Sequence, residues 1–337
     1  MISFKSDYAQ GAHPRLIEAL VKFNMEHNDG YGADQHSKNA VRFIQERVGG
    51  DCFVTLMAGG TLANLTVISH ALRQHHAVIS ADTGHIFTNE TGAVEATGHK
   101  VIPCAGKDGK LTAEMIQKAL DNHTHIPHVV RPKLVYISHP TELGTLYGKN
   151  DLTEISALCK QKGLYLYIDG ARLGCALAAQ KDELNMADLA ALADAFTAGG
   201  TKNGALFGEA VIIPNKALAE DFLFSVRQKG GLLARGGALG IQFEELFKDD
   251  LYIQLGGHAN KMARILKEGL TQAGFEFLVD SPTNQQFVYI DNKTFGKLSE
   301  KYLLRPWKRF EERTLVRLVT SWATKEEEVR EFLEDVM

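Results

Sequence analysis

The chain has 337 residues, 45% of them hydrophobic and 23% charged, the balance of an ordinary globular enzyme with one large and one smaller domain. A formal net charge of −4, with no clustered basic run, argues against nucleic acid as the main partner. No stretch approaches the ~18 uninterrupted apolar residues of a membrane span, and the first residues form no apolar signal core. We therefore expect a soluble, cytoplasmic protein that binds neither membrane nor nucleic acid. Its four cysteines have no CxxC spacing and fit a reducing compartment: Cys52, Cys104, Cys159 and Cys175.

Strands and helices alternate after an irregular arm over residues 6–14. Helical periodicity predicts helices at 15–24, 39–48, 62–73, 112–121 (with Thr112 as N-cap), 152–162 and 217–228. Short apolar runs predict strands at 53–57, 77–80, 100–103, 134–138, 164–169 and 208–214, with another short strand after Asp194. This alternation predicts an α/β fold with a mostly parallel sheet covered by helices.

The pattern changes near residue 249. A helix is expected at 255–272, strands at 275–279, 287–290 and 316–322, and a closing helix from residue 325. We therefore predict an N-terminal arm and large domain over residues 1–248, followed by a small α+β domain over residues 249–337 that packs over the mouth of the large one.

A glycine turn follows the first of these strands. Gly59, Gly60 and Thr61 lie between the strand at 53–57 and the next helix. Free N–H groups at such a helix start, together with the helix dipole, favour a phosphate. Many α/β helices begin with such a turn and hold no ligand. The absence of GxGxxG and GxxxxGK[ST] argues against dinucleotides and nucleoside triphosphates.

Asp169 and Lys202 are the two residues around which the chain is organised. Asp169 ends an apolar strand, and Lys202 follows a second short strand that breaks into small residues. Ligands of open α/β sheets lie beyond the carboxyl ends of the strands. An Asp that pairs with a protonated pyridine nitrogen and a Lys that holds an aldehyde as a Schiff base suit pyridoxal 5′-phosphate (PLP).

Further polar residues are candidates for the same site. His85 follows the next strand, where it can stack on a cofactor ring, and Arg317 interrupts an apolar strand, where it must be paired or face a cleft. Arg235 in a glycine-rich stretch is a candidate for a cofactor-edge or subunit contact, and Tyr31 lies in a loop. A metal site is not expected, because no acidic or Cys partner shares the spacing of the clustered histidines, His123, His125 and His128.

The order of these pieces resembles that of the fold-type-I PLP enzymes, and within them the threonine aldolase group, over nearly the whole chain. Asp-Gly-Ala-Arg-Leu from Asp169 and Gly-Gly-Thr-Lys-Asn-Gly-Ala around Lys202 carry the resemblance. It implies an aspartate-aminotransferase-like large domain, a small C-terminal domain, and dimers paired into tetramers with sites at subunit interfaces. Two departures are the Ala58-Gly59-Gly60-Thr61 cup and the run Ser138-His139-Pro140-Thr141-Glu142, where the family has Ser-Gly-Thr and Glu-Asn-Thr.

The resemblance also implies roles for single residues. Lys202 holds the cofactor, Asp169 pairs with the pyridine nitrogen, and His85 stacks on the ring. The cofactor-binding set is Gly59, Gly60, Thr61, His85, Asp169, Arg172, Lys202 and Arg235. The substrate-binding set is Ser6, Tyr31, Arg172 and Arg317, with Tyr31 supplied by a neighbouring subunit. His128 matches a second histidine near the substrate hydroxyl, so the catalytic set is Lys202, His85, Asp169 and His128.

The implied reaction is aldol cleavage of L-threonine, L-allo-threonine or related β-hydroxy-α-amino acids to glycine and an aldehyde. His85 and His128 are both candidates for the base that takes the hydroxyl proton. Alternatives are β-elimination or transamination on the same scaffold, a desulfurase that uses Cys175, and a non-enzymatic α/β binding protein.

Overall fold

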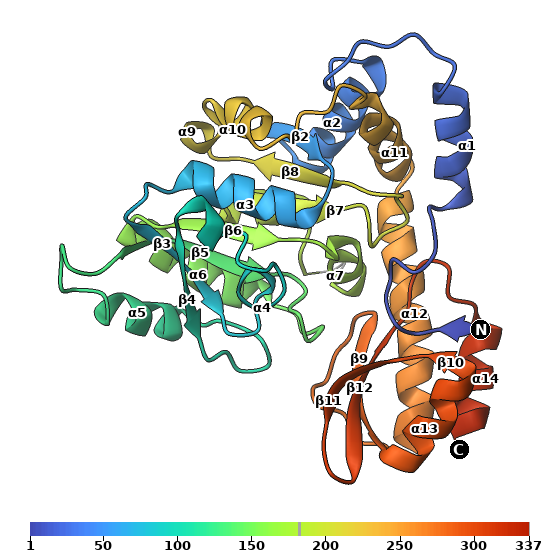
Figure 1. The fold of residues 1–337 in the computed structure, drawn as a ribbon. Helices are drawn as coiled ribbons and strands as arrows, with labels where there is room; N and C mark the ends of the chain where they lie inside the picture. Colours follow the sequence, from blue (N-terminus) through green and yellow to red (C-terminus); the bar gives the residue numbers. More distant parts are fainter. Residues whose placement is uncertain (181–182, 337) are drawn as a thin grey trace.

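A seven-stranded sheet organises the larger part of the chain in this computed structural model, which describes residues 1–180 and 183–336 (Figure 1). The strand order is β2-β8-β7-β6-β5-β3-β4, and β8 alone runs antiparallel to its neighbours. The strands of the described chain are β1 (Ile2–Ser3), β2 (Phe53–Met57), β3 (His76–Ala81), β4 (Lys100–Cys104), β5 (Arg131–Ser138), β6 (Tyr165–Asp169), β7 (Ala195–Gly199), β8 (Glu209–Ile213), β9 (Gln285–Asp291), β10 (Tyr302–Leu303), β11 (Arg305–Arg309) and β12 (Arg313–Val319).

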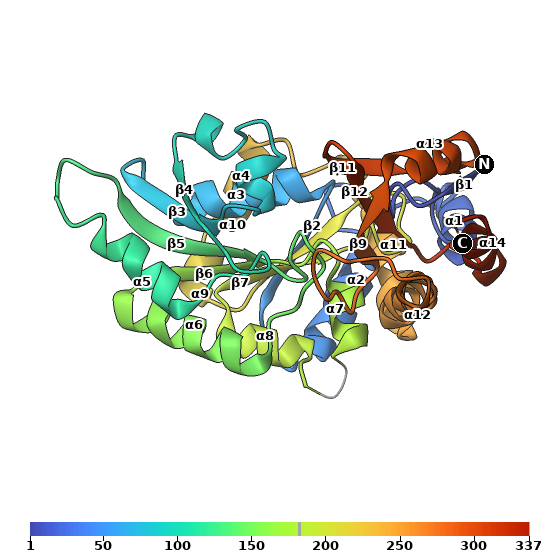
Figure 2. The same ribbon diagram turned by 90° about the horizontal axis from the view of Figure 1, so that it is seen from below.

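Helices cover both faces of this sheet (Figure 2). The described helices are α1 (Pro14–Phe23), α2 (Gln35–Val48), α3 (Gly60–Ala71), α4 (His85–Thr88), α5 (Ala113–Asp121), α6 (Lys149–Lys162), α7 (Leu173–Ala179), α8 (Met186–Leu192), α9 (Lys216–Ala219), α10 (Phe222–Gln228), α11 (Gly237–Lys248), α12 (Leu251–Gln272), α13 (Asn292–Lys301) and α14 (Glu326–Val336), with a short 3₁₀ turn at Glu95–Thr97. Apolar residues of α3 and α10 pack on one face, and those of α2, α6, α7, α8 and α11 on the other. Because both faces are covered, β3 and β7 are buried along their whole length, including the polar residues His76, Ser80 and Thr197.

The alternating pattern confirms the predicted α/β architecture, but two local predictions are wrong. The helix expected at 217–228 is two helices, α9 and α10, because Asp221 between them has a left-handed backbone with φ +57°. The strand expected at 275–279 is reduced to one isolated bridge between Phe277 and Val288. The predicted cap of α5 is confirmed, since the Thr112 side chain accepts a hydrogen bond from the Met115 N–H.

The smaller domain is built on the three-stranded sheet β11-β12-β9, with α12, α13 and α14 around it (Figure 1). Helix α12 joins the two parts of the molecule: it packs on α7, and Met262, Leu266 and Leu270 farther along enter the small core. The N-terminal residues also pack here, because β1 pairs with β10 and Phe4 is fully buried in this core. The predicted division at residue 248 therefore places a boundary just before α12, but the first residues of the chain pack with the C-terminal part.

Within the described ranges, none of the helices combines the length and the apolar character that a membrane crossing requires.

Candidate active site

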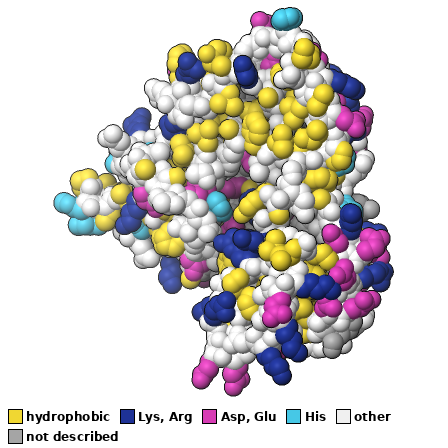
Figure 3. Space-filling view, turned by 45° about the vertical axis from the view of Figure 1, so that its right-hand side comes forward, with side chains coloured by type: hydrophobic (Ala, Val, Ile, Leu, Met, Phe, Trp, Pro, Cys, Tyr) yellow, Lys and Arg dark blue, Asp and Glu magenta, His cyan; other side chains and the backbone are white. Residues whose placement is uncertain are grey.

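A cavity of about 230 Å³ lies between the carboxyl edge of the large sheet and the small domain. Figure 3 shows the hollow near the middle of one face, with acidic, histidine and basic side chains around it. Its lining residues come from the N-terminal arm, both domains and several loops: Tyr8, His85, Asn89, Glu142, Arg172, Lys202, Arg305, Trp307 and Arg317. The position matches the rule that ligands of open α/β sheets bind beyond the strand ends.

Asp169 ends β6, and its carboxylate is held by three donors. Its Oδ2 accepts hydrogen bonds from the Tyr136 hydroxyl at 2.6 Å and the Asn64 amide at 2.9 Å, and its Oδ1 accepts one from the Ala171 N–H at 2.9 Å. Burial, followed by the charge of Asp169, raises the pKa of the Tyr136 phenol well above its usual value, so that phenol remains a donor. The carboxylate is thus fixed in one orientation at a 6% exposed position.

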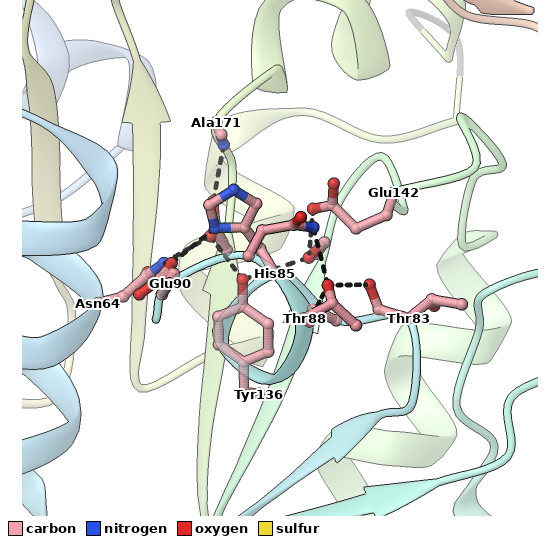
Figure 4. A network of polar contacts seen from close by, with 12 residues as sticks. Asn64, Thr83, His85, Thr88, Glu90, Tyr136, Glu142 and Ala171 are labelled. Atoms are coloured by element: carbon pink, nitrogen blue, oxygen red, sulfur yellow. Dashed lines mark hydrogen bonds and ion pairs between the residues drawn. The ribbon is translucent and has the colours of Figure 1, made fainter. Parts of the chain in front are cut away.

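His85 begins α4, and a buried carboxylate fixes its ring (Figure 4). Its Nδ1 lies 2.7 Å from Glu90 Oε1, and the same oxygen accepts a hydrogen bond from the Asn64 amide at 2.7 Å. Burial alone would lower the pKa of His85, but the hydrogen bond to Glu90 and the charges of Glu142 and Asp169 outweigh it and raise that pKa. The imidazole therefore keeps its second proton to a higher pH than a free histidine does.

The predicted phosphate turn is open. Gly59 caps α3 without a side-chain hydrogen bond, and Gly60 is the first residue of this 12-residue helix. A Cβ added at either glycine would meet no atom within 4 Å, and Thr61 beside them is exposed. The free N–H groups of the first helical turn are therefore accessible to an anion.

Lys202 lies in a tight loop between β7 and β8. Gly208 O accepts hydrogen bonds from the N–H groups of Gly200 at 2.9 Å and Thr201 at 3.2 Å, and the Asn203 amide donates to Tyr252 O at 2.7 Å. These bonds fix the backbone on both sides of Lys202, whose half-buried side chain borders the cavity.

The two predicted substrate arginines differ in their pairing. Arg172 is already bound to the arm, because its Nε and Nη2 donate to the two oxygens of Asp7 at 2.5 and 3.1 Å. Arg317 is 5% exposed; its Nε has no partner among the described residues, and its only side-chain hydrogen bond is a long one to Gln285 at 3.5 Å. Burial, with the nearby charges of Arg172 and Arg305, lowers the pKa of Arg317 to about 10. A buried cation in this state is ready to bind an anion such as a carboxylate.

Eight predicted site residues are not among those that line this cavity: Gly59, Gly60, Thr61 and Asp169, described above, and four others, Ser6, Tyr31, His128 and Arg235. His128 is exposed in the loop before β5, stacked on His125 with ring centroids 4.6 Å apart. That loop precedes the N-terminal end of β5, whereas the cavity lies beyond the other end, roughly 25 Å away for an eight-residue strand. Tyr31 and Arg235 are exposed in two loops that touch through the Tyr31 N–H and Ala234 O, and Ser6 is buried beside Asp7. Within one chain, Ser6 is therefore next to a residue that holds Arg172, whereas His128, Tyr31 and Arg235 line no part of the cavity.

The structure adds residues that the sequence reasoning missed. Asp7 and Asn64 fix Arg172 and Asp169, while Glu142, Arg305 and Trp307 line the cavity. Glu142 had a usable signal, because it follows the carboxyl end of β5 just as Asp169 ends β6. Arg305 and Trp307 had none, since they lie in a charged segment with no apolar run. Among the described residues, no group of three or more His, Cys, Asp or Glu side chains could hold a metal ion.

The residues present fit PLP. An open helix N-terminus can take a phosphate, the buried Asp169 carboxylate can accept a bond from a ring nitrogen, and Lys202 can reach an aldehyde in the adjoining cavity.

The strand order, the small domain and the position of the site are those of the α/β fold that the PLP-dependent aminotransferases have, and this chain shares that fold. Aspartate aminotransferase from Thermus thermophilus superposes with a TM-score of 0.73 at 16% identity, covering 100% of this chain and 92% of that one, which shows the shared fold. A family model described as beta-eliminating lyase matches residues 3–293. The chain belongs to this family of lyases.

Two relatives are close over their full length. A low-specificity L-threonine aldolase from Pseudomonas aeruginosa is 33% identical over 352 aligned positions, which cover 99% of this chain and 96% of the relative. The solved structure of a threonine aldolase from Leishmania major has a TM-score of 0.98 at 45% identity, covering 100% of this chain and 98% of that one. The predicted resemblance to the threonine aldolase group is confirmed.

Proposed function

We propose that this protein is a PLP-dependent aldolase that cleaves L-threonine, L-allo-threonine or a related β-hydroxy-α-amino acid to glycine and an aldehyde. The observation that carries the proposal is the meeting of Lys202, His85, Arg172 and Arg317 at one cavity beside Asp169. The likeness to the Leishmania and Pseudomonas threonine aldolases supports the same activity.

In this proposal each residue has a defined task. The N–H groups at the start of α3, from Gly59 to Thr61, hold the phosphate, and Lys202 holds the aldehyde carbon. Asp169, oriented by Tyr136 and Asn64, keeps a proton on the ring nitrogen. When bound, the cofactor supplies an electron-withdrawing ring that delocalises the charge left on Cα.

Arg317 binds the substrate carboxylate, and Arg172 completes that side of the cavity while Asp7 holds it in place. Fixing the carboxylate sets the rotation about the bond between nitrogen and Cα. With the cofactor bound, the substrate bond held across its ring would be the one weakened, so Arg317 would favour Cα–Cβ cleavage by fixing the orientation of the carboxylate.

Two rival activities are tested on the same preparation. β-Elimination is favoured by the description of the matching family, and transamination by the shared fold. A desulfurase is disfavoured, because burial raises the pKa of the Cys175 thiol to about 12 and keeps it from forming the required thiolate.

The test is the release of acetaldehyde and glycine from L-threonine and L-allo-threonine, compared with products from tyrosine, tryptophan and a keto acid. The proposal expects equal amounts of aldehyde and glycine. Ammonia with a keto product, or amino transfer without aldehyde, would assign the chain to one of the rivals.

We further propose that the protein works as a homo-oligomer in the cytoplasm. Large apolar side chains are exposed around the arm, α1 and the lysine loop, among them Tyr8, Ile17, Val21, Leu206 and Phe207, and Figure 3 shows apolar surface spread over this part of the molecule. A second copy of the chain would cover them, and Tyr31 and Arg235 would then serve a neighbour's site. The four free cysteines agree with a reducing compartment.

A further inference from the structure

The fold fixes the loop that carries Glu142, but the Glu142 carboxylate itself makes few polar contacts. Its one side-chain hydrogen bond comes from the Ser138 hydroxyl at 3.4 Å, and it forms no ion pair with any described residue. Of the side chains that line the cavity in the described chain, Glu142 is the only carboxylate.

The loop that carries Glu142 is tied to both domains. Thr141 and Thr145 bond to each other through their backbones at 2.9 Å and their hydroxyls at 2.7 Å. Gly144 O accepts hydrogen bonds from the hydroxyls of Ser281 and Thr283 in the C-terminal part, each at 2.9 Å. Gly144 itself has φ +80° and no space for a side chain, so this turn has one shape. The fixed loop directs Glu142 into the cavity.

The surroundings of Glu142 are charged. His85 of α4 and Lys202 after β7 line the same cavity, with Arg172 after β6, Arg305 of β11 and Arg317 of β12. Figure 4 shows Glu142 and Glu90 on opposite sides of the His85 ring, and the charge of Glu142 contributes to the raised pKa of His85. The other cavity groups are poor acceptors for a hydroxyl proton: arginine does not give up its proton, and Lys202 is assigned to the cofactor.

His85 is the remaining rival. Its Nδ1 is engaged by Glu90 at 2.7 Å, and its raised pKa keeps the ring protonated over more of the neutral range. A protonated ring has no free lone pair, so it serves better as a cation beside the cofactor than as a base. His128 lies at the far end of β5 and lines no part of this cavity within one chain.

We propose that Glu142 is a catalytic residue of the aldol cleavage and accepts the proton of the substrate's β-hydroxyl group. This inference rests on the proposed function. The O–H bond breaks and its electron pair forms the new C=O bond of the aldehyde, while the Cα–Cβ pair remains on Cα. Glu142 is left neutral, and it releases its proton to solvent after the aldehyde departs.

The test separates two reactions of the same loaded enzyme. Aldol cleavage of threonine needs the hydroxyl proton to be removed, whereas exchange of a glycine α-proton with D₂O uses the same cofactor and carboxylate contacts without any hydroxyl. We expect Glu142→Gln to lower kcat for cleavage by about 100-fold or more, the usual range for removal of a general base. KM should stay equal or fall, because a negative charge near Arg317 is removed, and glycine exchange should stay within about threefold.

The matched control is Glu154→Gln, an exposed carboxylate on α6, which should leave both reactions unchanged. A second readout needs no activity: since Glu142 raises the pKa of His85, NMR titration should show that pKa lower in Glu142→Gln. Retained cleavage in Glu142→Gln would overturn the proposal, as would a parallel loss of cleavage and glycine exchange, which indicates a structural role. A wild-type enzyme that exchanges glycine but cleaves no β-hydroxy amino acid would instead refute the proposed function.

Discussion

At the scale of single residues, Glu209 is a carboxyl group near Lys202 whose burial changes its pKa. It begins β8, opposite Met57 of β2 and Gly199 of β7, and is 4% exposed. Its Oε2 has no hydrogen-bond partner in the described part of the chain. Burial raises the pKa of this carboxyl to about 8, although the charge of Lys202 acts in the opposite direction. The folded protein therefore holds Glu209 neutral at a pH where the unfolded chain ionises it.

This difference predicts a pH-dependent stability. Because the folded pKa is above the unfolded one, stability is lost as pH rises from about 4.5 towards 8, at about 1.4 kcal/mol per pH unit. Glu209→Gln cannot ionise, so its melting temperature should match the wild type near pH 5 and exceed it near pH 8. Thermal melts across this range measure the effect, with Glu300→Gln on the surface as the control. A constant difference at every pH would show that Glu209 is not neutral in the fold.

Single residues were predictable where position in the sheet and chemistry agreed. Asp169 and Lys202 follow strands, and their side chains suit one cofactor, so the sequence was enough to pair them. Asp7 was not predictable, because its contact with Arg172 joins residues 165 positions apart through the path of the arm. Removing either partner of such a buried pair leaves an uncompensated charge, which explains why the arm is fixed there.

At the scale of elements, buried strands were the most predictable, because short apolar runs between turn residues are typical of buried strands. The second half of the chain was harder. Strand β11 carries Arg305, Lys308 and Arg309 and has no apolar alternation, so only pairing with β12 defines it. The pairing of β1 with β10 joins the first residues of the chain to residues 302–303, and a two-residue strand has no local sequence pattern that predicts such a pairing. Of these elements, β11 lines the cavity from the small-domain side, through Arg305 and Trp307.

At the scale of the whole molecule, the exposed apolar side chains around α1 predict assembly of copies of this chain. Ile17 and Val21 are one helical turn apart and 39% and 66% exposed. Wild type should sediment as a dimer or tetramer, and the Ile17→Glu/Val21→Glu double variant should shift towards the monomer, because it places two charges in an apolar contact. Phe310→Glu, a 40% exposed position in the small domain, is the control that should keep the wild-type mass. Analytical ultracentrifugation decides; a monomeric wild type, or a double variant of unchanged mass, would contradict this prediction.

We propose that Lys202 holds PLP at the cavity beside Asp169. The most direct test of this assignment is to add PLP to the protein, reduce with borohydride, and map the labelled peptide by mass spectrometry. A visible absorption band that borohydride removes, with the label on Lys202 and on no other lysine, is the predicted result. No band, or a label at a different lysine, would contradict the account and separate the shared fold from the proposed chemistry.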